Sequence, residues 1–194
     1  MGRLMRKLPL FDRPLIDRLL TPDWLATTTL AHLPLDPLLE RGIRALVLDV
    51  DRTILPRHQG TVPPVAEQWL RHAANQMPIH LLSNNPSRRR IGSVAENLGL
   101  PYTAAAGKPR RTALRRVLEE LRLEPAQVAL VGDRIFTDVL VGNRLGLFTV
   151  LVRPIDPQGQ PCRHDHMQSL ELRLAALVGA GGGAVPEPQP GSQR

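Results

Sequence analysis

From residue 43 onward, the chain alternates short apolar runs with longer segments of helical periodicity. Runs rich in Val, Leu and Ile are typical of buried strands, and apolar residues recurring every three to four positions are typical of helices. The expected strands are 43–50, 79–82, a short one near 102, 128–131 and 148–152, and the expected helices are 65–74, 89–98, 111–121, 137–145 and 167–178. This alternation predicts an α/β fold, a three-layer Rossmann-like core whose five-stranded parallel sheet carries helices on both faces.

The segments on either side of this core have a different composition. Residues 1–42 form an arm rich in Leu and Pro, and its short amphipathic stretches predict docking over the core, with insertion into a membrane surface as the alternative. Residues 179–194 form a Gly- and Pro-rich tail with too little apolar surface to fold, so we expect it to be disordered. The core itself is expected to cover residues 43–178.

Composition excludes several classes of protein. No apolar run in the sequence reaches the roughly 20 residues that span a membrane, and charged residues interrupt any apolar signal segment near the N-terminus. The single cysteine, Cys162, cannot form an internal disulfide and fits a reducing compartment. We therefore expect a cytoplasmic protein. The nearby pair His164 and His166 fits an exposed loop better than a metal site.

The positive charge is concentrated in one stretch. The net charge is +7, and residues 86–122 carry 9 basic and 3 acidic side chains. Such a stretch attracts an anion, which leaves nucleic acid, anionic lipid and a phosphorylated metabolite as candidates, unless the arginines only solvate helix surfaces. Aromatic residues make up 3% of the chain and offer few stacking platforms for bases, so a nucleic-acid partner is less favoured.

Acidic side chains follow two of the expected strands. Asp49 and Asp51 come at the end of the first strand, and Asp133 and Asp138 follow the fourth. Ligands of open parallel sheets bind beyond the carboxyl ends of the strands, so these carboxylates are expected to meet at one edge. Clustered carboxylates repel one another and call for a cation or a shared proton. Capping or turn formation is the alternative for each aspartate taken alone.

Groups suited to an anion follow the other strands. Ser83 and Asn84 end the second strand with a hydroxyl and an amide that can bind a phosphate oxygen. Lys108 follows the third strand, and it is one of two lysines in a chain that otherwise uses arginine. A compact ammonium kept at this place indicates a point-charge role. The sequence thus predicts acids for a cation and donors for an anion at the same edge.

With these residues in view, the sequence resembles the haloacid dehalogenase (HAD) superfamily of phosphotransferases. The segment DVDRT at 49–53 matches its first motif, Ser83 the second, Lys108 the third and GDRIFTD at 132–138 the fourth. The resemblance implies that Asp49 is the nucleophile, which forms an aspartyl-phosphate, and that Asp51 is the general acid and base. It also implies Mg²⁺ held by Asp49, the Asp51 carbonyl and Asp133, with Asp138 in support. Thr53, Ser83, Asn84 and Lys108 would bind the phosphoryl group.

The intervals between the motifs leave no room for a cap domain, since each already holds a core helix. The capless chain, the Leu/Pro-rich arm and the SNN and GDRIFTD segments are similar to the YqeG-like subclass IIIA phosphatases. That group resembles the phosphatidylglycerophosphate phosphatases, which implies a lipid monophosphate as substrate and a peripheral place at the inner face of a membrane. Arg52 departs from the Asn expected after the second Asp. A phosphatase of soluble or nucleic-acid esters and a basic RNA-binding module remain as alternatives, and the sequence does not indicate an oligomeric state.

Overall fold

The computed structural model describes residues 15–163, 165–178 and 180. Its strands are β1 (Trp24–Leu25), β2 (Ala45–Leu48), β3 (Ile79–Leu82), β4 (Tyr102–Thr103), β5 (Val128–Gly132) and β6 (Phe148–Leu151). Its helices are α1 (Leu15–Leu20), α2 (Asp36–Glu40), α3 (Pro64–Ala74), α4 (Arg88–Leu98), α5 (Thr112–Leu121), α6 (Leu140–Asn143) and α7 (His166–Leu177). Short 3-10 turns lie at η2 (Leu30–His32) and η3 (Pro125–Gln127), and a π-helical turn, η4 (Ile135–Val139), precedes α6.

The strands form one parallel sheet with the order β1-β6-β5-β2-β3-β4. The α/β fold with a parallel sheet is confirmed, and β2 to β6 are the five strands that the sequence predicts. The sixth strand, β1, comes from the arm and pairs with β6 at the edge. It has two residues, too few to show a periodicity. The carboxylate of Asp23 holds it in place by accepting hydrogen bonds from the backbone N and Oγ1 of Thr149.

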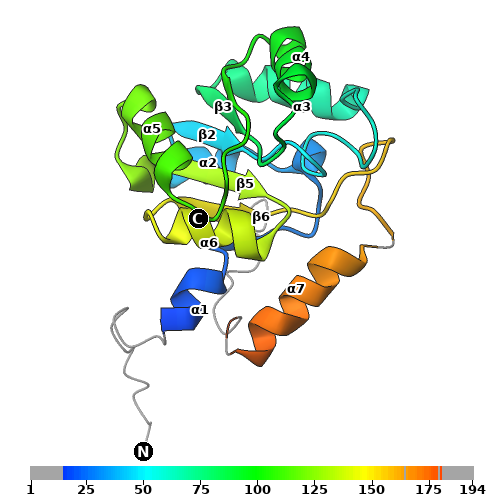
Figure 1. The fold of residues 1–194 in the computed structure, drawn as a ribbon. Coiled ribbons are helices and arrows are strands. Elements are labelled where there is room, and N and C mark those ends of the chain that lie inside the picture. The colour runs from blue at the N-terminus through cyan, green and yellow to red at the C-terminus, as the bar shows by residue number, and fades with distance from the viewer. Residues whose placement is uncertain (1–14, 164, 179, 181–194) are drawn as a thin grey trace, which may run out of the picture.

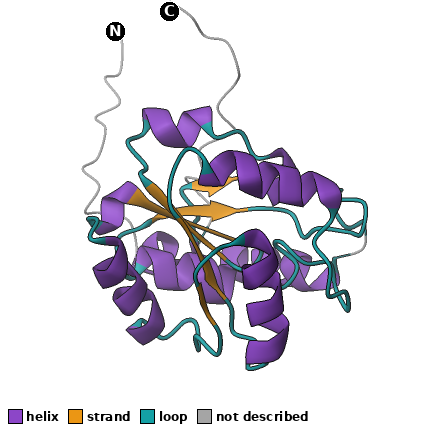
Figure 2. Cartoon of the chain, turned by 90° about the horizontal axis from the view of Figure 1, so that it is seen from above, coloured by secondary structure: helices purple, strands orange, loops and turns teal. Residues whose placement is uncertain are grey.

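The two faces of the sheet are covered by different helices (Figures 1 and 2). Alternating strand residues point to opposite faces, so Leu46 and Leu48 pack with α3 and α4, whereas Ala45 and Val47 pack with α5. The central strands are buried on both sides, which explains their almost purely apolar sequences. The three-layer arrangement of the core is therefore set by the alternation within β2.

Much of the arm belongs to the core. Leu30, Leu33 and Leu38 are fully buried beside α3, and the Trp69 indole donates a hydrogen bond to the Leu33 carbonyl. Docking, rather than insertion into a membrane, is thus the arrangement of residues 24–38. Residues 1–14 of the arm and the tail, apart from Ala180, lie outside the described residues, as does His164.

No cap domain is present within the described residues. The interval between β2 and β3 holds α3, and the interval between β3 and β5 holds α4, β4 and α5. Among the helices that the structure describes, none has the length and apolar character needed to cross a membrane.

Candidate active site

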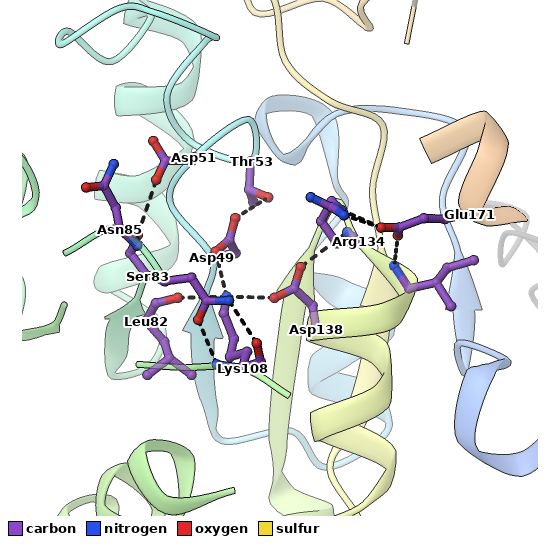
Figure 3. Close-up of polar contacts among 12 residues, drawn as sticks. Asp49, Asp51, Thr53, Leu82, Ser83, Asn85, Lys108, Arg134, Asp138 and Glu171 are labelled. Carbon is purple, nitrogen blue, oxygen red and sulfur yellow. Dashed lines mark hydrogen bonds and ion pairs between the residues drawn. The ribbon is translucent and has the colours of Figure 1, made fainter. Parts of the chain in front are cut away.

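The expected site residues meet where the strand order reverses. The chain runs from β2 outward to β4 and then returns to β5 on the other side of β2. Ligands of such sheets bind at this reversal, beyond the strand ends. Asp49 follows β2, Ser83 follows β3 and Asp133 follows β5, and Figure 3 shows Asp49, Ser83, Lys108 and Asp138 gathered there.

Asp49 lies at the centre of this group. Its carboxylate accepts a hydrogen bond from Lys108 Nζ at 2.6 Å and one from Thr53 Oγ1 at 3.4 Å. Burial raises the pKa of Asp49 to about 6, and the neighbouring Asp138 and Asp51 carboxylates add to the rise while Lys108 opposes it. A buried carboxylate that is ionised near neutral pH beside a fixed ammonium is suited to nucleophilic attack.

Lys108 lies between the carboxylates of Asp49 and Asp138. Its ammonium donates to Asp49 Oδ1 and Asp138 Oδ1, each at 2.6 Å, and to the Leu82 carbonyl at 2.9 Å. Burial alone would lower the pKa of Lys108, but Asp138 and Asp49 outweigh it and raise the pKa above its ordinary value. The lysine therefore stays charged in the buried site, where it can stabilise a phosphoryl group.

Three carboxylates are placed to hold a cation. Oxygens of Asp49, Asp133 and Asp138 lie within 4.8 Å of one another, and all three residues are buried. Burial raises the pKa of Asp133 well above its ordinary value, and the charges of Asp49 and Asp138 add to this. Asp133 Oδ2 is buried and receives no hydrogen bond from any described residue, since Arg52 Nε is 3.7 Å away. An orphaned carboxylate oxygen among acids fits a hard divalent cation.

The end of β5 requires a glycine at position 132. A Cβ at Gly132 would overlap the Asp138 side chain, so any larger residue there would displace that carboxylate. Asp138 lies in the π-helical turn η4, and such turns often occur at functional sites. The spacing from Gly132 to Asp138 in the fourth motif thus has a direct steric cause.

Asp51 lies at the exposed side of the group. Its carboxylate accepts hydrogen bonds from Ser83 Oγ at 3.3 Å and from Arg90 Nη2 of the guanidinium at 3.2 Å, and its side chain is 38% exposed. It is the one site carboxylate in easy reach of solvent. This position suits a group that exchanges protons with a substrate and with water.

Asn84 makes a contact different from the predicted one. Its side-chain amide donates to the Lys108 carbonyl at 3.0 Å, and its oxygen accepts from the Lys108 backbone N at 2.7 Å. The side chain thereby fixes the loop that carries the ammonium. Phosphate binding by Asn84 remains a prediction, whereas the positioning of Lys108 is visible in these two bonds.

Helix α7 contributes residues that sequence reasoning missed. Gln168 Nε2 donates to the carbonyls of Asp133 and Val152, at 2.8 and 2.7 Å. Glu171 accepts from the Ile135 backbone N at 2.7 Å and from Arg134 Nε at 2.6 Å, so both side chains hold the loop that follows β5. The available signal was the spacing of Gln168 and Glu171, three positions apart and so on one side of the helix.

Arg52 has a defined place despite its departure from the expected Asn. Its backbone is in the left-handed region, with φ at 70°, and its guanidinium pairs with Asp165 at the start of α7. The same side chain lies beside Asp133. Arg52 therefore links the loop after β2 to α7.

A cavity of about 130 Å³ opens over these groups. Its lining residues come from all the strand ends described above: Asp49, Asp51, Arg52, Asn84, Lys108, Asp133, Arg134 and Thr137. Its small size and mixed charge fit a phosphate together with a cation.

Comparison with known proteins agrees with this geometry. A family model described as "HAD-hyrolase-like" matches residues 105–154. The Bacillus subtilis protein named "Probable phosphatase YqeG" is 30% identical over 125 residues, which are 64% of this chain and 72% of that protein. The chain belongs to the YqeG-like phosphatases of the HAD superfamily. It is accordingly an enzyme, a HAD-type phosphatase.

Two further proteins are similar to this chain. The chloroplastic phosphatidylglycerophosphate phosphatase 1 of Chlamydomonas reinhardtii is 27% identical over 146 residues, which are 71% of this chain and 54% of that protein. The chain thus spans about half the length of that relative. A HAD superfamily (subfamily III A) hydrolase from Legionella pneumophila matches 75% of this chain and 94% of its own, with 16% identity and a TM-score of 0.47.

Proposed function

We propose that this phosphatase is Mg²⁺-dependent, works through an aspartyl-phosphate at Asp49, and acts on a lipid phosphate such as phosphatidylglycerophosphate. The observation that carries the chemistry is the buried Asp49 carboxylate, held between Lys108 and two further acids beneath a small open cavity. The lipid substrate rests on the named relative and on the surface described below.

In the first step, an Asp49 oxygen attacks phosphorus and the bond to the leaving oxygen breaks. Lys108 and the hydroxyls of Thr53 and Ser83 bind the phosphoryl oxygens and offset their charge. Asp51 gives its proton to the leaving oxygen, so the alcohol departs neutral. The phosphoryl group then remains on Asp49 as an acyl phosphate.

In the second step, Asp51 acts in the opposite direction. Its carboxylate takes a proton from a water molecule, and that water attacks phosphorus. The bond to Asp49 breaks, inorganic phosphate leaves, and both aspartates return to their starting states. The solvent-exposed side of Asp51 supports this role because the water must enter from there.

Three buried carboxylates, those of Asp49, Asp133 and Asp138, support the proposed metal site. We propose that Asp49, Asp133 and the Asp51 backbone carbonyl hold Mg²⁺, and that Asp138 supports this set. When bound, Mg²⁺ supplies positive charge that offsets the clustered carboxylates and stabilises charge on the phosphoryl oxygens.

The surface of α7 supports a substrate that lies in a membrane. The helix buries Gln168 and Glu171, and Leu172 packs beside them. Its other large apolar residues are exposed in a stripe with helical spacing that continues to the residue after the helix: Met167, Leu170, Leu174, Leu177 and Val178. A helix that faces water is usually polar on its outer side. A contiguous exposed apolar stripe therefore commonly marks an interaction site.

The neighbouring short helix has the same character. Leu15 and Ile16 of α1 are exposed, and both α1 and α7 pack on η4, where Figure 1 shows them on the same side of the sheet. The charged residues exposed on the two helices, Arg18 and Arg173, are basic. An apolar surface flanked by arginines complements an anionic bilayer, so we propose that this face rests on the membrane.

The test is phosphate release from vesicles that contain phosphatidylglycerophosphate, beside a panel of soluble phosphate esters. We expect release that requires Mg²⁺ and disappears in Asp49→Asn. Turnover of soluble esters alone would keep the chemistry and remove the lipid substrate. Activity of Asp49→Asn equal to that of the wild type would contradict the nucleophile.

A phosphatase of nucleic-acid ends is the second candidate. Arg88 and Arg89 lie exposed on α4, near the site, as a contact to a phosphate backbone would require. Steep salt dependence of RNA binding without turnover of the lipid would favour this candidate.

A further inference from the structure

A second cavity adjoins the site on the outer side of Asp51. It has a volume of about 330 Å³, and it shares Asp51 and Arg52 with the smaller cavity above Asp49. The rest of its lining comes from the loop after β2, the loop after β3 and the first turn of α4: Pro56, Arg57, His58, Asn85 and Arg90. The two cavities therefore meet at the carboxylate that we assign as general acid.

The charge of this lining is strongly one-sided. Arg52, Arg57 and Arg90 are basic, His58 adds an imidazole, and Asp51 is the one carboxylate among the lining residues. Arg57 and His58 are exposed, so their charged ends are available to a ligand. A concave surface with this balance of charge concentrates anions.

Helix α4 begins with arginines, although positive charge is unfavourable at the N-terminal end of a helix. Arg88, Arg89 and Arg90 occupy its first turn, which holds no acidic residue. The N-terminal end of a helix is its positive end, so cations there are unfavourable and an anion is favourable. Arg90 also has a buried Nε that forms no hydrogen bond within the described part of the chain. An anion in the cavity would relieve the crowded charge and could supply the missing acceptor.

The position of the cavity shows which part of a substrate reaches it. In the proposed reaction, the transferred phosphoryl group lies above Asp49 and Asp51 protonates the leaving oxygen. The leaving alcohol must then extend past Asp51, into the space between Arg57, His58 and Arg90.

We propose that this cavity is a second anion subsite, which binds a phosphate or phosphodiester carried by the leaving alcohol. The inference rests on the proposed function for the direction of the alcohol. It assigns specificity to Arg57 and His58, which contact none of the reacting groups. The preferred substrate is then a phosphomonoester with a second phosphorus-containing anion a few bonds away, whether on a lipid head group or on a soluble bisphosphate.

The experiment compares three soluble probes that share a phosphomonoester. Glycerol 3-phosphate has no second anion, deacylated phosphatidylglycerophosphate has a phosphodiester, and fructose 1,6-bisphosphate has a second monoester. We expect kcat/KM to be at least about tenfold higher for a doubly anionic probe, since one charge-assisted contact is worth that factor. Preference for the deacylated lipid indicates a head group, and preference for the sugar indicates a soluble bisphosphate.

Three variants distinguish binding at the subsite from the general electrostatic attraction of anions to the protein. Arg57→Ala and His58→Ala should remove the preference and leave glycerol 3-phosphate turnover within about twofold. Arg89→Ala is the control, because it deletes an exposed positive charge at the start of α4, beside Arg90 in sequence but outside the cavity lining. Equal losses for all probes, an equal loss in Arg89→Ala, or no preference in the wild type would overturn the subsite.

Binding distinguishes failure of the subsite from failure of the reaction. In Asp49→Asn, calorimetry should show the preferred probe binding about tenfold more tightly than glycerol 3-phosphate, and Arg57→Ala should cancel the difference. This difference without turnover in the wild type would keep the subsite and reject the proposed function. Turnover without the difference would do the reverse.

Discussion

Helices α5 and α7 have similar lengths, but they differ in the kind of side chain that each one buries. In α5, the apolar residues Leu114, Val117 and Leu118 are buried against the sheet and the charged residues face solvent. In α7, the polar residues Gln168 and Glu171 are buried against the site loop, whereas leucines such as Leu170 face solvent. The burial of α5 follows the hydrophobic effect alone. The burial of α7 does not, because its inner face also carries Gln168 and Glu171, whose side chains bond to the loop after β5.

The largest expected effect breaks the packing of α5. Leu114→Ala removes a fully buried side chain and leaves a cavity between α5 and the sheet. We expect the free energy of unfolding to fall by about 2–5 kcal/mol, measured by urea denaturation. The kcat/KM of the folded fraction should stay unchanged, and a loss of kcat/KM without loss of stability would contradict a purely structural role.

The next effect breaks the inner face of α7. Glu171→Ala leaves the Ile135 backbone N and the Arg134 guanidinium without their acceptor, so we expect a loss of about 1–3 kcal/mol in unfolding free energy. The loop that carries Asp133 should also loosen, and the affinity for Mg²⁺ should fall about tenfold in a calorimetric titration.

The matched control for that variant lies on α5. Glu119 is exposed there, and Glu119→Ala should change the unfolding free energy by less than about 0.5 kcal/mol and leave Mg²⁺ binding unaltered. Equal effects in the two glutamate variants would show that the inner face of α7 has no special tie to the site.

A smaller effect on stability, with a large one on membrane binding, is expected at the outer face. The double change Leu170→Gln and Leu174→Gln replaces two exposed side chains, so unfolding should change by less than about 1 kcal/mol. Sedimentation with anionic vesicles should fall at least about tenfold, because each leucine would otherwise insert into the bilayer. Unchanged vesicle binding would remove the membrane from the account of α7.

The smallest effect concerns pH and the metal. The folded-state pKa of Asp49 is raised to about 6, so its ionised form costs stability above that pH, and this cost is absent in acid, where the folded protein keeps the proton. Mg²⁺ offsets the ionised form, and protons compete with it. We therefore expect Mg²⁺ to raise the Tm by more at about pH 7.5 than at about pH 5, measured by scanning fluorimetry. An equal rise at both pH values would contradict the role of Asp49 in binding the metal.

The parts of the fold that could be predicted are those with local signals. Strands β2 and β5 are buried on both faces, so their sequences are continuous apolar runs. The site residues were found because parallel strands bring their carboxyl ends to one edge, which turns positions far apart in sequence into neighbours. Asp49, Asp133 and Asp138 meet there as that rule implies.

The parts that could not be predicted depend on long-range contacts. Strand β1 is held by the bond between Asp23 and Thr149, 126 residues apart, and nothing in its two residues indicates a strand. The roles of Gln168 and Glu171 depend on which face of α7 is buried, and an apolar stripe on that helix indicates the wrong face. Helical periodicity shows that a helix has two faces. Which face of α7 is buried depends on its contacts with the loop after β5, far away in sequence.

The most direct test of the central claim is capture of the phosphorylated enzyme. The protein is mixed with Mg²⁺ and an intact phosphate ester that it hydrolyses, quenched in acid within milliseconds, and digested for mass spectrometry. The account predicts one phosphoryl group on the peptide that contains Asp49, sensitive to hydroxylamine and absent from Asp49→Asn. A phosphoryl group on another residue, or turnover at full rate with none on Asp49, would contradict it.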